Sequence, residues 1–404
     1  MTISTVIDRC RICDNTELLP VLDLGPQALT GVFPRRRDEQ VPMVPLELVV
    51  CSPAGCGLVQ LRHTADFGLM YGEGYGYRSS LNRAMVEHLR GKVAAIRELV
   101  DLGPGDLVVD IGSNDGTLLS AYPADGPDLV GVDPAAEFFR GYYPPHIELI
   151  PGFFSRELLG GRRAKVVTSI AMFYDLPRPM EFMAEVRDLL AGDGVWVTEQ
   201  SYLPAMIETT AYDVVCHEHL DYYGLAQIEW MAERTGLKVV QAELNPIYGG
   251  SLSVVLARRE SARVPDEAAL ARIRAGERGL DYQGFASRAA EHRDGLREFL
   301  TASADKGLLT LGYGASTKGN VILQYCGLGE ADLPCIAEVN QDKYGCFTPG
   351  TGIPIVSEEE ARARRPDQFL VLPWIYRDAI VARERDFLGS GGRLVFPLPA
   401  MEVV

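Results

Sequence analysis

Short apolar runs recur between residues 107 and 256, and stretches with helical spacing of apolar and polar positions separate them. Strands that alternate with helices in this way are typical of a parallel sheet with helical crossovers. The pattern therefore predicts an α/β fold that ends in a closing strand. The predicted strands are 107–111, 129–132, 165–170, 195–198 and 252–256.

A second alternating unit follows a helical segment near the middle of the chain. Residues 265–303 are rich in Ala, Glu and Arg and are predicted to form one long helix, and a shorter helix is predicted to start near Thr117. Upstream, residues 81–100 carry Met85, Leu89, Val93 and Ile96 on one face, which predicts an amphipathic helix. The predicted strands of the second unit are 308–311, 335–339, 368–372 and 393–396.

The length and composition narrow the class of protein. A chain of 404 residues is too long for one ordinary domain. We expect two or three domains; three of them would occupy residues 1–68, 69–262 and 263–404, and residues 1–65 show little helical periodicity. No apolar run approaches the roughly 18 residues of a membrane span, and the chain starts without a signal-peptide pattern, so we expect a cytoplasmic protein with no membrane partner.

The formal net charge of −16 argues against a nucleic-acid partner, which would require a basic surface. An anionic small-molecule substrate would need a local basic pocket in so acidic a chain.

A glycine-containing loop follows the first predicted strand of the central unit, and an acidic residue ends the second strand. Such an acidic residue is placed to hydrogen-bond a ribose. The loop has the spacing G-x-x-x-G and not the G-x-G-x-x-G of dinucleotide-binding loops. Its acidic residues favour S-adenosylmethionine (SAM), which carries an ammonium and a sulfonium, over NAD; an ordinary tight turn is the structural alternative. The candidate cofactor-binding residues are Asp110, Gly112, Asn114, Asp115, Gly116 and Asp133.

Two cysteine pairs lie within the first 56 residues, Cys10 with Cys13 and Cys51 with Cys56. In a cytoplasmic protein, two close pairs favour metal ligation over disulfides. Four thiolates complete a tetrahedral zinc site and leave no open position, so this zinc is predicted to be structural. Four free, buried cysteines are the alternative.

A cluster of titratable side chains runs from Cys216 to Tyr223, after the strand that ends near residue 200. Ligands of open α/β sheets bind beyond the carboxyl ends of the strands, which is where this cluster should lie. His219 beside Glu218 could form a general base with an orienting carboxylate. A metal site on His217 and His219 is less favoured, because the H-E-H spacing differs from H-E-x-x-H. A polar helix start with capping or buried histidines is the structural alternative.

The second unit also has a glycine-rich turn, at residues 311–320, which follows a strand and precedes a predicted helix. Ser316, Thr317 and Lys318 at a helix N-terminus favour an anion site, although the turn is not a P-loop. It would bind a phosphate without necessarily hydrolysing it, and a purely structural turn is the alternative.

Together these motifs resemble the three-domain, SAM-dependent sugar C-methyltransferases that act on nucleotide-linked 4-keto-deoxysugars. That resemblance implies a small N-terminal zinc-binding lobe, a central class I (Rossmann-like) methyltransferase domain, and a C-terminal Rossmann-like α/β domain that helps to bind the nucleotide sugar. The motifs are the four cysteines, Tyr75 to Ser80, Asp110 to Gly116, His217 to His219 with Tyr222-Tyr223, Gly249-Gly250-Ser251, Gly312 to Asn320, and Thr348 to Thr351.

The resemblance also implies a mechanism. His219 would remove the proton next to the sugar ketone, and the enolate carbon would attack the methyl group of SAM. Glu218, Tyr222 and Tyr75 would assist, and Ser316 and Lys318 would face the diphosphate. The remaining residues implied to contact substrate are Tyr77, Arg78, Tyr223 and Asn320.

One position departs from the family. Members with ketosugar activity often have Tyr three residues before the catalytic histidine, where this chain has Cys216. The acceptor atom therefore stays open at this point, and an N- or O-methyltransferase on the same scaffold is an alternative. A non-catalytic module that binds SAM or a nucleotide sugar, and an NAD-dependent sugar oxidoreductase, are alternatives of other classes.

Overall fold

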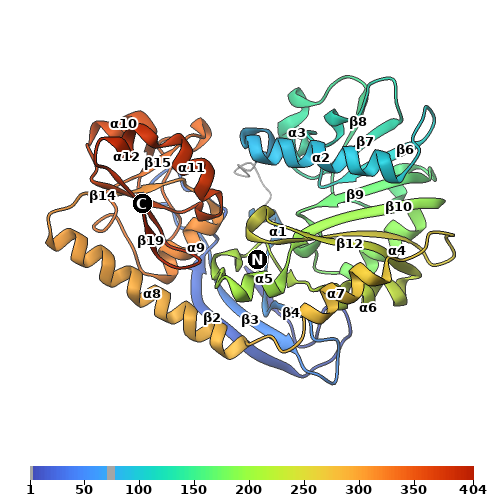
Figure 1. The fold of residues 1–404 in the computed structure, drawn as a ribbon, viewed down its shortest axis with the longest axis horizontal. Helices are drawn as coiled ribbons and strands as arrows, with labels where there is room; N and C mark the ends of the chain where they lie inside the picture. The colour runs from blue at the N-terminus through green and yellow to red at the C-terminus, as the bar shows by residue number, and fades with distance from the viewer. Residues whose placement is uncertain (1–2, 71–77) are drawn as a thin grey trace.

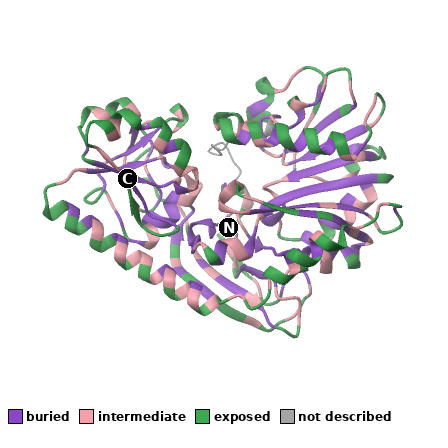
Figure 2. Cartoon of the chain, viewed as in Figure 1, coloured by how far each residue is buried: buried purple, intermediate pink, exposed green. Residues whose placement is uncertain are grey.

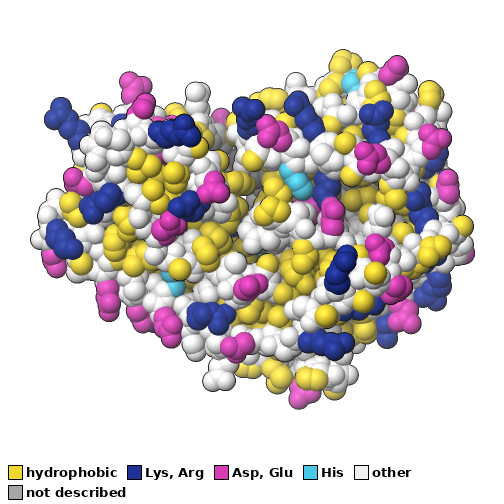
Figure 3. Space-filling view, in the orientation of Figure 1, with side chains coloured by type: hydrophobic (Ala, Val, Ile, Leu, Met, Phe, Trp, Pro, Cys, Tyr) yellow, Lys and Arg dark blue, Asp and Glu magenta, His cyan; other side chains and the backbone are white. Residues whose placement is uncertain are grey.

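The computed structural model describes residues 3–70 and 78–404. Two α/β units lie side by side, and the strands of the N-terminal segment run below and between them (Figure 1). The molecular surface is notched between the two α/β units (Figure 3). Among the described residues, no helix is long and apolar enough to cross a membrane.

The central unit is built on a seven-stranded sheet with the order β12-β13-β10-β9-β6-β7-β8. The strands from β8 to β10 are parallel, and β13 and β12 close the sheet as antiparallel strands, so the predicted parallel sheet with a closing strand is confirmed. β8 and β12 were not predicted from the pattern. The strands are β6 (Leu107–Ile111), β7 (Asp128–Asp133), β8 (Ile147–Pro151), β9 (Ala164–Ile170), β10 (Leu190–Ser201), β12 (Leu237–Asn245) and β13 (Ser251–Arg258).

Helices cover both faces of this sheet, which explains why its inner strands are continuous apolar runs. Val108 and Val166 pack against α2, and the adjacent Val109 and Val167 share a core with α4 and α6 on the opposite face. The predicted amphipathic helix is confirmed as α2, whose buried face includes Met85. The helices here are α2 (Arg83–Leu99), α3 (Ala136–Phe139), α4 (Pro179–Leu189), α5 (Leu203–Glu208) and α6 (Leu225–Thr235).

The helix predicted near Thr117 is wrong, because only a short 3₁₀ turn, Leu119–Ala121, forms there. Pro123 and Gly126 follow at once, and such residues are unfavourable in a helix. The cofactor loop therefore leads into a turn and not into a long crossover helix.

The N-terminal segment forms a four-stranded sheet with the order β11-β4-β3-β2, beside the two-stranded pair β1-β5. Its strand β11 (Asp221–Tyr222) comes from the histidine cluster and pairs with β4. The N-terminal lobe and the histidine cluster are thus parts of one sheet. The other elements are β1 (Ser4–Val6), β2 (Leu18–Ala28), β3 (Met43–Cys51), β4 (Val59–Leu61), β5 (His63–Ala65) and α1 (Phe67–Met70).

The C-terminal unit has a second mostly parallel sheet, with the order β16-β15-β14-β17-β18-β19. The prediction of one long helix over 265–303 is wrong, because α7 (Glu267–Gly276) and α8 (Tyr282–Asp305) are separated at Gly279, whose φ is +70°. The remaining elements are β14 (Thr310–Tyr313), α9 (Thr317–Tyr325), β15 (Ile336–Glu338), β16 (Ile355–Ser357), α10 (Glu358–Ala363), β17 (Gln368–Val371), α11 (Arg377–Arg383), α12 (Arg385–Gly389), β18 (Arg393–Phe396) and β19 (Glu402–Val403).

One hydrophobic core runs across the boundary between the lobes. It joins side chains of the N-terminal sheet, residues 203–222 and the C-terminal unit. The buried positions follow the strands of all these parts (Figure 2). Because α8 and α9 pack on β2, the N-terminal strands hold the C-terminal unit against the segment that carries the histidines.

Candidate active site

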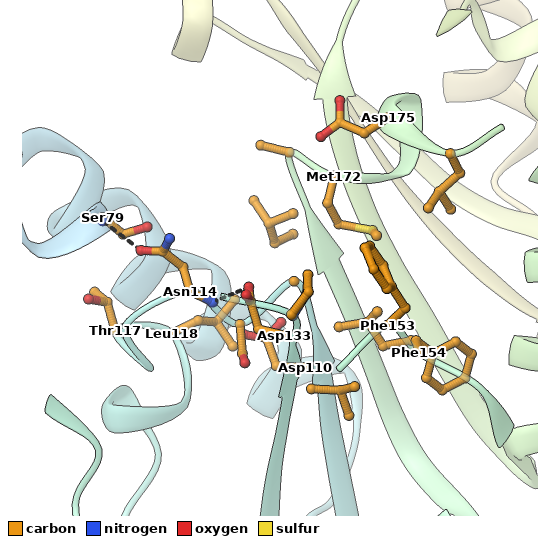
Figure 4. A pocket seen from close by; sticks show the side chains of 18 of the residues that line it. Ser79, Asp110, Asn114, Thr117, Leu118, Asp133, Phe153, Phe154, Met172 and Asp175 are labelled. Carbon is orange, nitrogen blue, oxygen red and sulfur yellow. Dashed lines mark hydrogen bonds between the residues drawn. The ribbon is translucent and has the colours of Figure 1, made fainter. Parts of the chain in front are cut away.

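A cavity lies at the carboxyl ends of β6 and β9, where the order of the central strands reverses. Ligands of doubly wound sheets bind at this switch point. The cavity has about 1140 Å³ of empty space including its mouth. Asn114 and Asp133 lie at one end of it and Asp175 at the other (Figure 4). Its floor comes from the loop after β6, and one wall comes from residues 170–176 after β9.

Two buried carboxylates face this cavity. Asp110 accepts a hydrogen bond from the Thr168 hydroxyl at 2.5 Å, and burial raises its pKa to about 7. Asp133 accepts the backbone N–H groups of Asn114 and Ala135 at 2.8 and 2.7 Å, and burial raises its pKa as well. The negative charge of Asp133 also raises the pKa of Asp110, so a cationic ligand such as SAM fits these two carboxylates better than a diphosphate.

The rest of the predicted cofactor loop divides into two groups. Gly112, with a φ of +75°, and Asn114 line the cavity, and the side-chain oxygen of Asn114 accepts the N–H of Ser79 at 3.0 Å. Asp115 and Gly116 do not line it. The Asp115 carboxylate binds the N–H of Ser80 and the Thr117 hydroxyl, so it shapes the loop and its junction with α2.

His219 stands beside this cavity in one defined tautomer. Its Nδ1 lies 2.9 Å from the carbonyl oxygen of Val214, which can only accept, so Nδ1 carries the proton and Nε2 is the basic nitrogen. The ring packs edge-on against Tyr174, with 4.3 Å between centroids, and Tyr174 belongs to the turn η5 (Phe173–Asp175) that ends in the cavity-lining Asp175. No partner for Nε2 occurs among the described residues.

The environment of His219 keeps this imidazole neutral. Burial, and to a smaller extent the positive charge of Lys318, lowers the pKa of His219 to about 3. The ring is therefore neutral at neutral pH, and the lone pair of its Nε2 has no partner among the described residues.

His217 has a different role, although it is only two residues away. Its Nε2 donates to the carbonyl oxygen of Val44 at 3.0 Å, and its Nδ1 accepts the N–H of Thr30 at 3.3 Å. Both ring nitrogens are used by the N-terminal lobe, and the side chain is buried. His217 is therefore a structural residue, and the metal site considered for His217 and His219 does not form.

Three neighbours of the histidines have mainly structural contacts. Glu218 lies near the Thr30 hydroxyl, at 3.5 Å, and burial raises its pKa. Tyr222 is buried, and its hydroxyl donates to Val214 O at 3.3 Å, the same oxygen that holds His219. Cys216 is buried, and burial raises the pKa of its thiol well above the usual value. Tyr222 thus lies where it helps to position His219 through a shared acceptor.

Two predicted substrate residues lie away from the cavity. Tyr223 is fully buried, stacks on Phe173 and donates to Asp221 at 3.0 Å, so it is a core residue. Asn320 is also buried and donates to the carbonyl oxygen of Thr30 at 2.7 Å, which ties α9 to the N-terminal lobe. In the structure both side chains are engaged in packing between distant segments.

The remaining predicted residues are placed as follows. Arg78 contacts both the hydroxyl and the ring of Tyr142. Tyr75 and Tyr77 lie outside the described residues. Ser316 caps α9 by accepting the N–H of Gly319 at 3.0 Å. Lys318, in the first turn of α9, extends its Nζ to 3.5 Å from the carbonyl oxygen of Tyr248, a residue that lines the cavity.

The four N-terminal cysteines converge as predicted. Their sulfur atoms all lie within 4.8 Å of one another, and Cys10–Cys56 and Cys13–Cys51 are each separated by 3.5 Å. Zn–S bonds of roughly 2.3 Å at tetrahedral angles would place sulfur atoms roughly 3.8 Å apart, so the cluster fits a zinc ion.

Three family models match successive parts of the chain. A zinc binding domain matches residues 10–71, a methyltransferase domain matches residues 85–242, and a C-methyltransferase C-terminal domain matches residues 246–399. The C-methyltransferase NovU of Streptomyces niveus is 33% identical over 411 residues, covering 98% of this chain and 97% of NovU. The chain belongs to the C-methyltransferase family.

Two solved structures are similar to part of this C-methyltransferase. The methyltransferase bound to the activator Trm112 of Haloferax volcanii is 16% identical with a TM-score of 0.37, covering 44% of this chain and 94% of that one. The CcbJ methyltransferase of Streptomyces caelestis is 17% identical with a TM-score of 0.35, covering 42% of this chain and 89% of that one.

The C-methyltransferase is thus a SAM-dependent enzyme with a zinc-binding N-terminal lobe. Asp110, Gly112, Asn114 and Asp133 would hold SAM in the cavity. Met172 and Asp175 in the cavity wall and the loop residue Tyr248 were not predicted from the sequence. Tyr248 has a φ of +57°, which is unusual for a bulky residue, but the adjacent Gly249-Gly250 was the only sequence signal of an irregular turn there.

The zinc lobe also contacts the histidine segment, residues 216–223, of the C-methyltransferase. Arg11, between two of the zinc-ligand cysteines, forms a buried ion pair with Asp221 at 3.5 Å. The N–H of Leu61 donates to the carbonyl oxygen of Leu220 at 2.8 Å. These contacts hold the chain just after His219, and the contacts of His217 hold it just before His219.

Proposed function

We propose that this C-methyltransferase acts on a nucleotide-diphosphate-linked deoxy-ketosugar, and that His219 removes the proton on the carbon next to the ketone. The observation that carries the proposal is the orientation of His219, a neutral imidazole with Nδ1 held by Val214 and Nε2 directed away from that contact, beside the cofactor cavity. A module that only binds SAM or a sugar would have no need for a base held in this way.

The proposed reaction forms and breaks one bond at each step. The C–H bond next to the ketone breaks, its proton moves to Nε2 of His219, and the electron pair is delocalised onto the ketone oxygen. Bound SAM supplies an electrophilic methyl group, to which the nucleophilic carbon then forms a C–C bond while the C–S bond breaks. An N- or O-methyltransferase would not need the first step, so proton removal distinguishes these alternatives.

The nucleotide end of the substrate is assigned to the C-terminal unit. The turn after β14 and the first turn of α9 lie at the switch point of the second sheet, between β14 and β17. Free N–H groups at the start of a helix favour a phosphate group. The start of α9 would thus provide a local anion site in a chain that is acidic overall.

Isotope exchange tests this function. The purified protein, with S-adenosylhomocysteine in place of SAM, is incubated in deuterium oxide with a panel of nucleotide-linked ketosugars, and deuterium next to the ketone is followed by NMR. We expect exchange in at least one ketosugar, and methyl transfer to the same carbon when labelled SAM is added. Tight SAM binding without exchange or transfer across the panel would favour the binding module, and transfer to nitrogen or oxygen without exchange would favour the alternative transferase.

The pH profile of exchange gives a second test. Because burial lowers the pKa of His219 to about 3, the base stays neutral well below pH 6.5, and exchange should not fall between pH 7 and pH 5.5. An acid limb centred near pH 6.5 would contradict this environment for His219. The folded pKa of both His217 and His219 lies below the unfolded value, so unfolding is favoured as pH falls below 6.5, and circular dichroism at each pH must show folded protein.

A further inference from the structure

We propose that Lys318 is the group that stabilises the negative charge on the ketone oxygen when the neighbouring proton is removed, and that it acts there and not as a ligand of the diphosphate. This inference rests on the proposed function. It gives a role to a lysine whose side chain is directed across the boundary between the two α/β units.

Lys318 has neighbours on two sides, of which the first is Tyr248. Its Nζ lies 3.5 Å from the carbonyl oxygen of Tyr248 and 5.7 Å from the centre of the Tyr248 ring. Tyr248 lines the cofactor cavity of the central unit, although Lys318 belongs to α9 of the C-terminal unit. The ammonium group therefore reaches the edge of the cavity that holds the methyl donor.

The second side is the turn η6 (Tyr212–Val214), against which α9 packs. Asp213 of this turn is buried, and its Oδ2 accepts the indole N–H of Trp374 at 2.8 Å. Its other oxygen, Oδ1, has no hydrogen-bond partner among the described residues. The negative charge of Asp213 favours the ammonium form of Lys318, which burial opposes by lowering the pKa of the lysine.

The same turn orients the base. Val214, next to Asp213, provides the carbonyl oxygen that holds Nδ1 of His219. The positive charge of Lys318 lowers the pKa of His219, and Cys216 raises the pKa of Lys318. The lysine therefore lies on the side of the histidine cluster that faces α9. The base and the ammonium are thus both placed by η6 and both lie near the cofactor cavity.

The chemistry at this place needs a donor. Removing a proton next to a ketone moves negative charge to the ketone oxygen, and a preorganised N–H donor in a partly buried site stabilises that charge strongly. The Tyr222 hydroxyl is already directed to Val214, and Cys216 offers only a weak, buried S–H donor. Lys318 stays protonated throughout, so no proton other than the one taken by His219 is moved.

A diphosphate role for Lys318 predicts different measurements. A lysine that binds the diphosphate contributes to the affinity for any nucleoside diphosphate, with or without a sugar. A lysine at the ketone oxygen contributes to the rate of proton removal and little to that affinity. Lys318→Met and Lys318→Arg separate these roles. Lys165→Met is a matched control, because Lys165 forms an ion pair with Asp106 at 3.0 Å, at the amino ends of β9 and β6 and away from the cavity.

The experiment measures deuterium exchange at saturating ketosugar and the Kd of uridine and thymidine diphosphates by calorimetry, with thermal melting as a check of folding. We expect Lys318→Met to slow exchange by about 10²- to 10³-fold, with the Kd changed less than about 3-fold. Lys318→Arg should recover part of the rate, because it keeps the charge, and Lys165→Met should exchange like the wild type.

Two results would overturn the inference. If Lys318→Met exchanges at the wild-type rate, or weakens diphosphate binding tenfold with exchange unchanged, Lys318 does not act at the ketone oxygen. If the folded wild-type protein exchanges no ketosugar, the proposed function fails, and the role of Lys318 fails with it. A slowed exchange in a Lys318→Met protein that melts and binds SAM like the wild type supports the inference.

Discussion

Replacing His219 with Asn is expected to slow deuterium exchange next to the ketone, and methyl transfer, by about 10²- to 10⁴-fold. Asparagine can keep a hydrogen bond to the carbonyl oxygen of Val214 through its side-chain N–H, but it has no nitrogen that accepts a proton near neutral pH. The side chain is similar in size and polar, so the cofactor cavity should stay intact. SAM affinity, measured by calorimetry, should change little.

His146→Asn is the matched control for this variant. His146 is exposed and does not line the cavity, so the same replacement there should leave exchange and transfer unchanged. Methyl transfer at the wild-type rate in His219→Asn would show that another group is the base. His217→Asn is expected to lower the melting temperature, because it removes contacts to Thr30 and Val44, and it is therefore unsuitable as a control.

Removal of zinc is expected to disorder the N-terminal lobe and to disturb the position of His219. Cys10→Ser removes a buried member of the four-cysteine cluster in the lobe. Structural zinc sites contribute directly to folding, so the strands of the lobe should lose their order when the ion is lost. Because β11 pairs with β4, and Thr30 and Val44 hold His217, the segment on either side of His219 would lose its supports.

The expected result of Cys10→Ser is a protein with little zinc, a lower melting temperature and a rate of proton exchange reduced by at least about tenfold. The cavity for SAM is formed mainly by the central sheet, so SAM affinity should fall much less than exchange. Zinc content by atomic emission, melting and exchange are compared with those of Cys346→Ser, whose cysteine is buried but belongs to no cluster of ligands. Full exchange in a zinc-free protein would show that the lobe does not position the base.

Much of the fold could be predicted because it depends on local pattern. The inner strands of both sheets are apolar runs, and parallel strands covered on both faces have this composition wherever they occur. The strands of the N-terminal lobe were not predicted. β2 contains two prolines, Pro20 and Pro26, and its pairing with β3 shifts register beside both, so the alternation expected of a strand is interrupted.

Some parts of the candidate site could likewise be predicted from local sequence, and others could not. The glycine loop with Asp110 and Asp133, and the two cysteine pairs, are local arrangements whose chemistry follows from residue type and spacing. Tyr223 and Asn320 look equally polar in the sequence, but each is occupied by a partner in a distant segment.

The sequence by itself determined two α/β units, an acidic cofactor loop and a four-thiolate cluster, because each of these depends on residues close together in the chain. The sequence already favoured His219 as the base, but only the tertiary structure showed how the surroundings of His217 and His219 differ. His217 contacts the backbone of Thr30 and Val44, 187 and 173 positions away, through both ring nitrogens, whereas His219 contacts Val214 through Nδ1, and its Nε2 has no partner among the described residues. The same holds for Lys318, whose neighbours Asp213 and Tyr248 come from another unit. Which nitrogen is basic, and which charge lies beside it, depends on long-range packing that residue spacing does not encode.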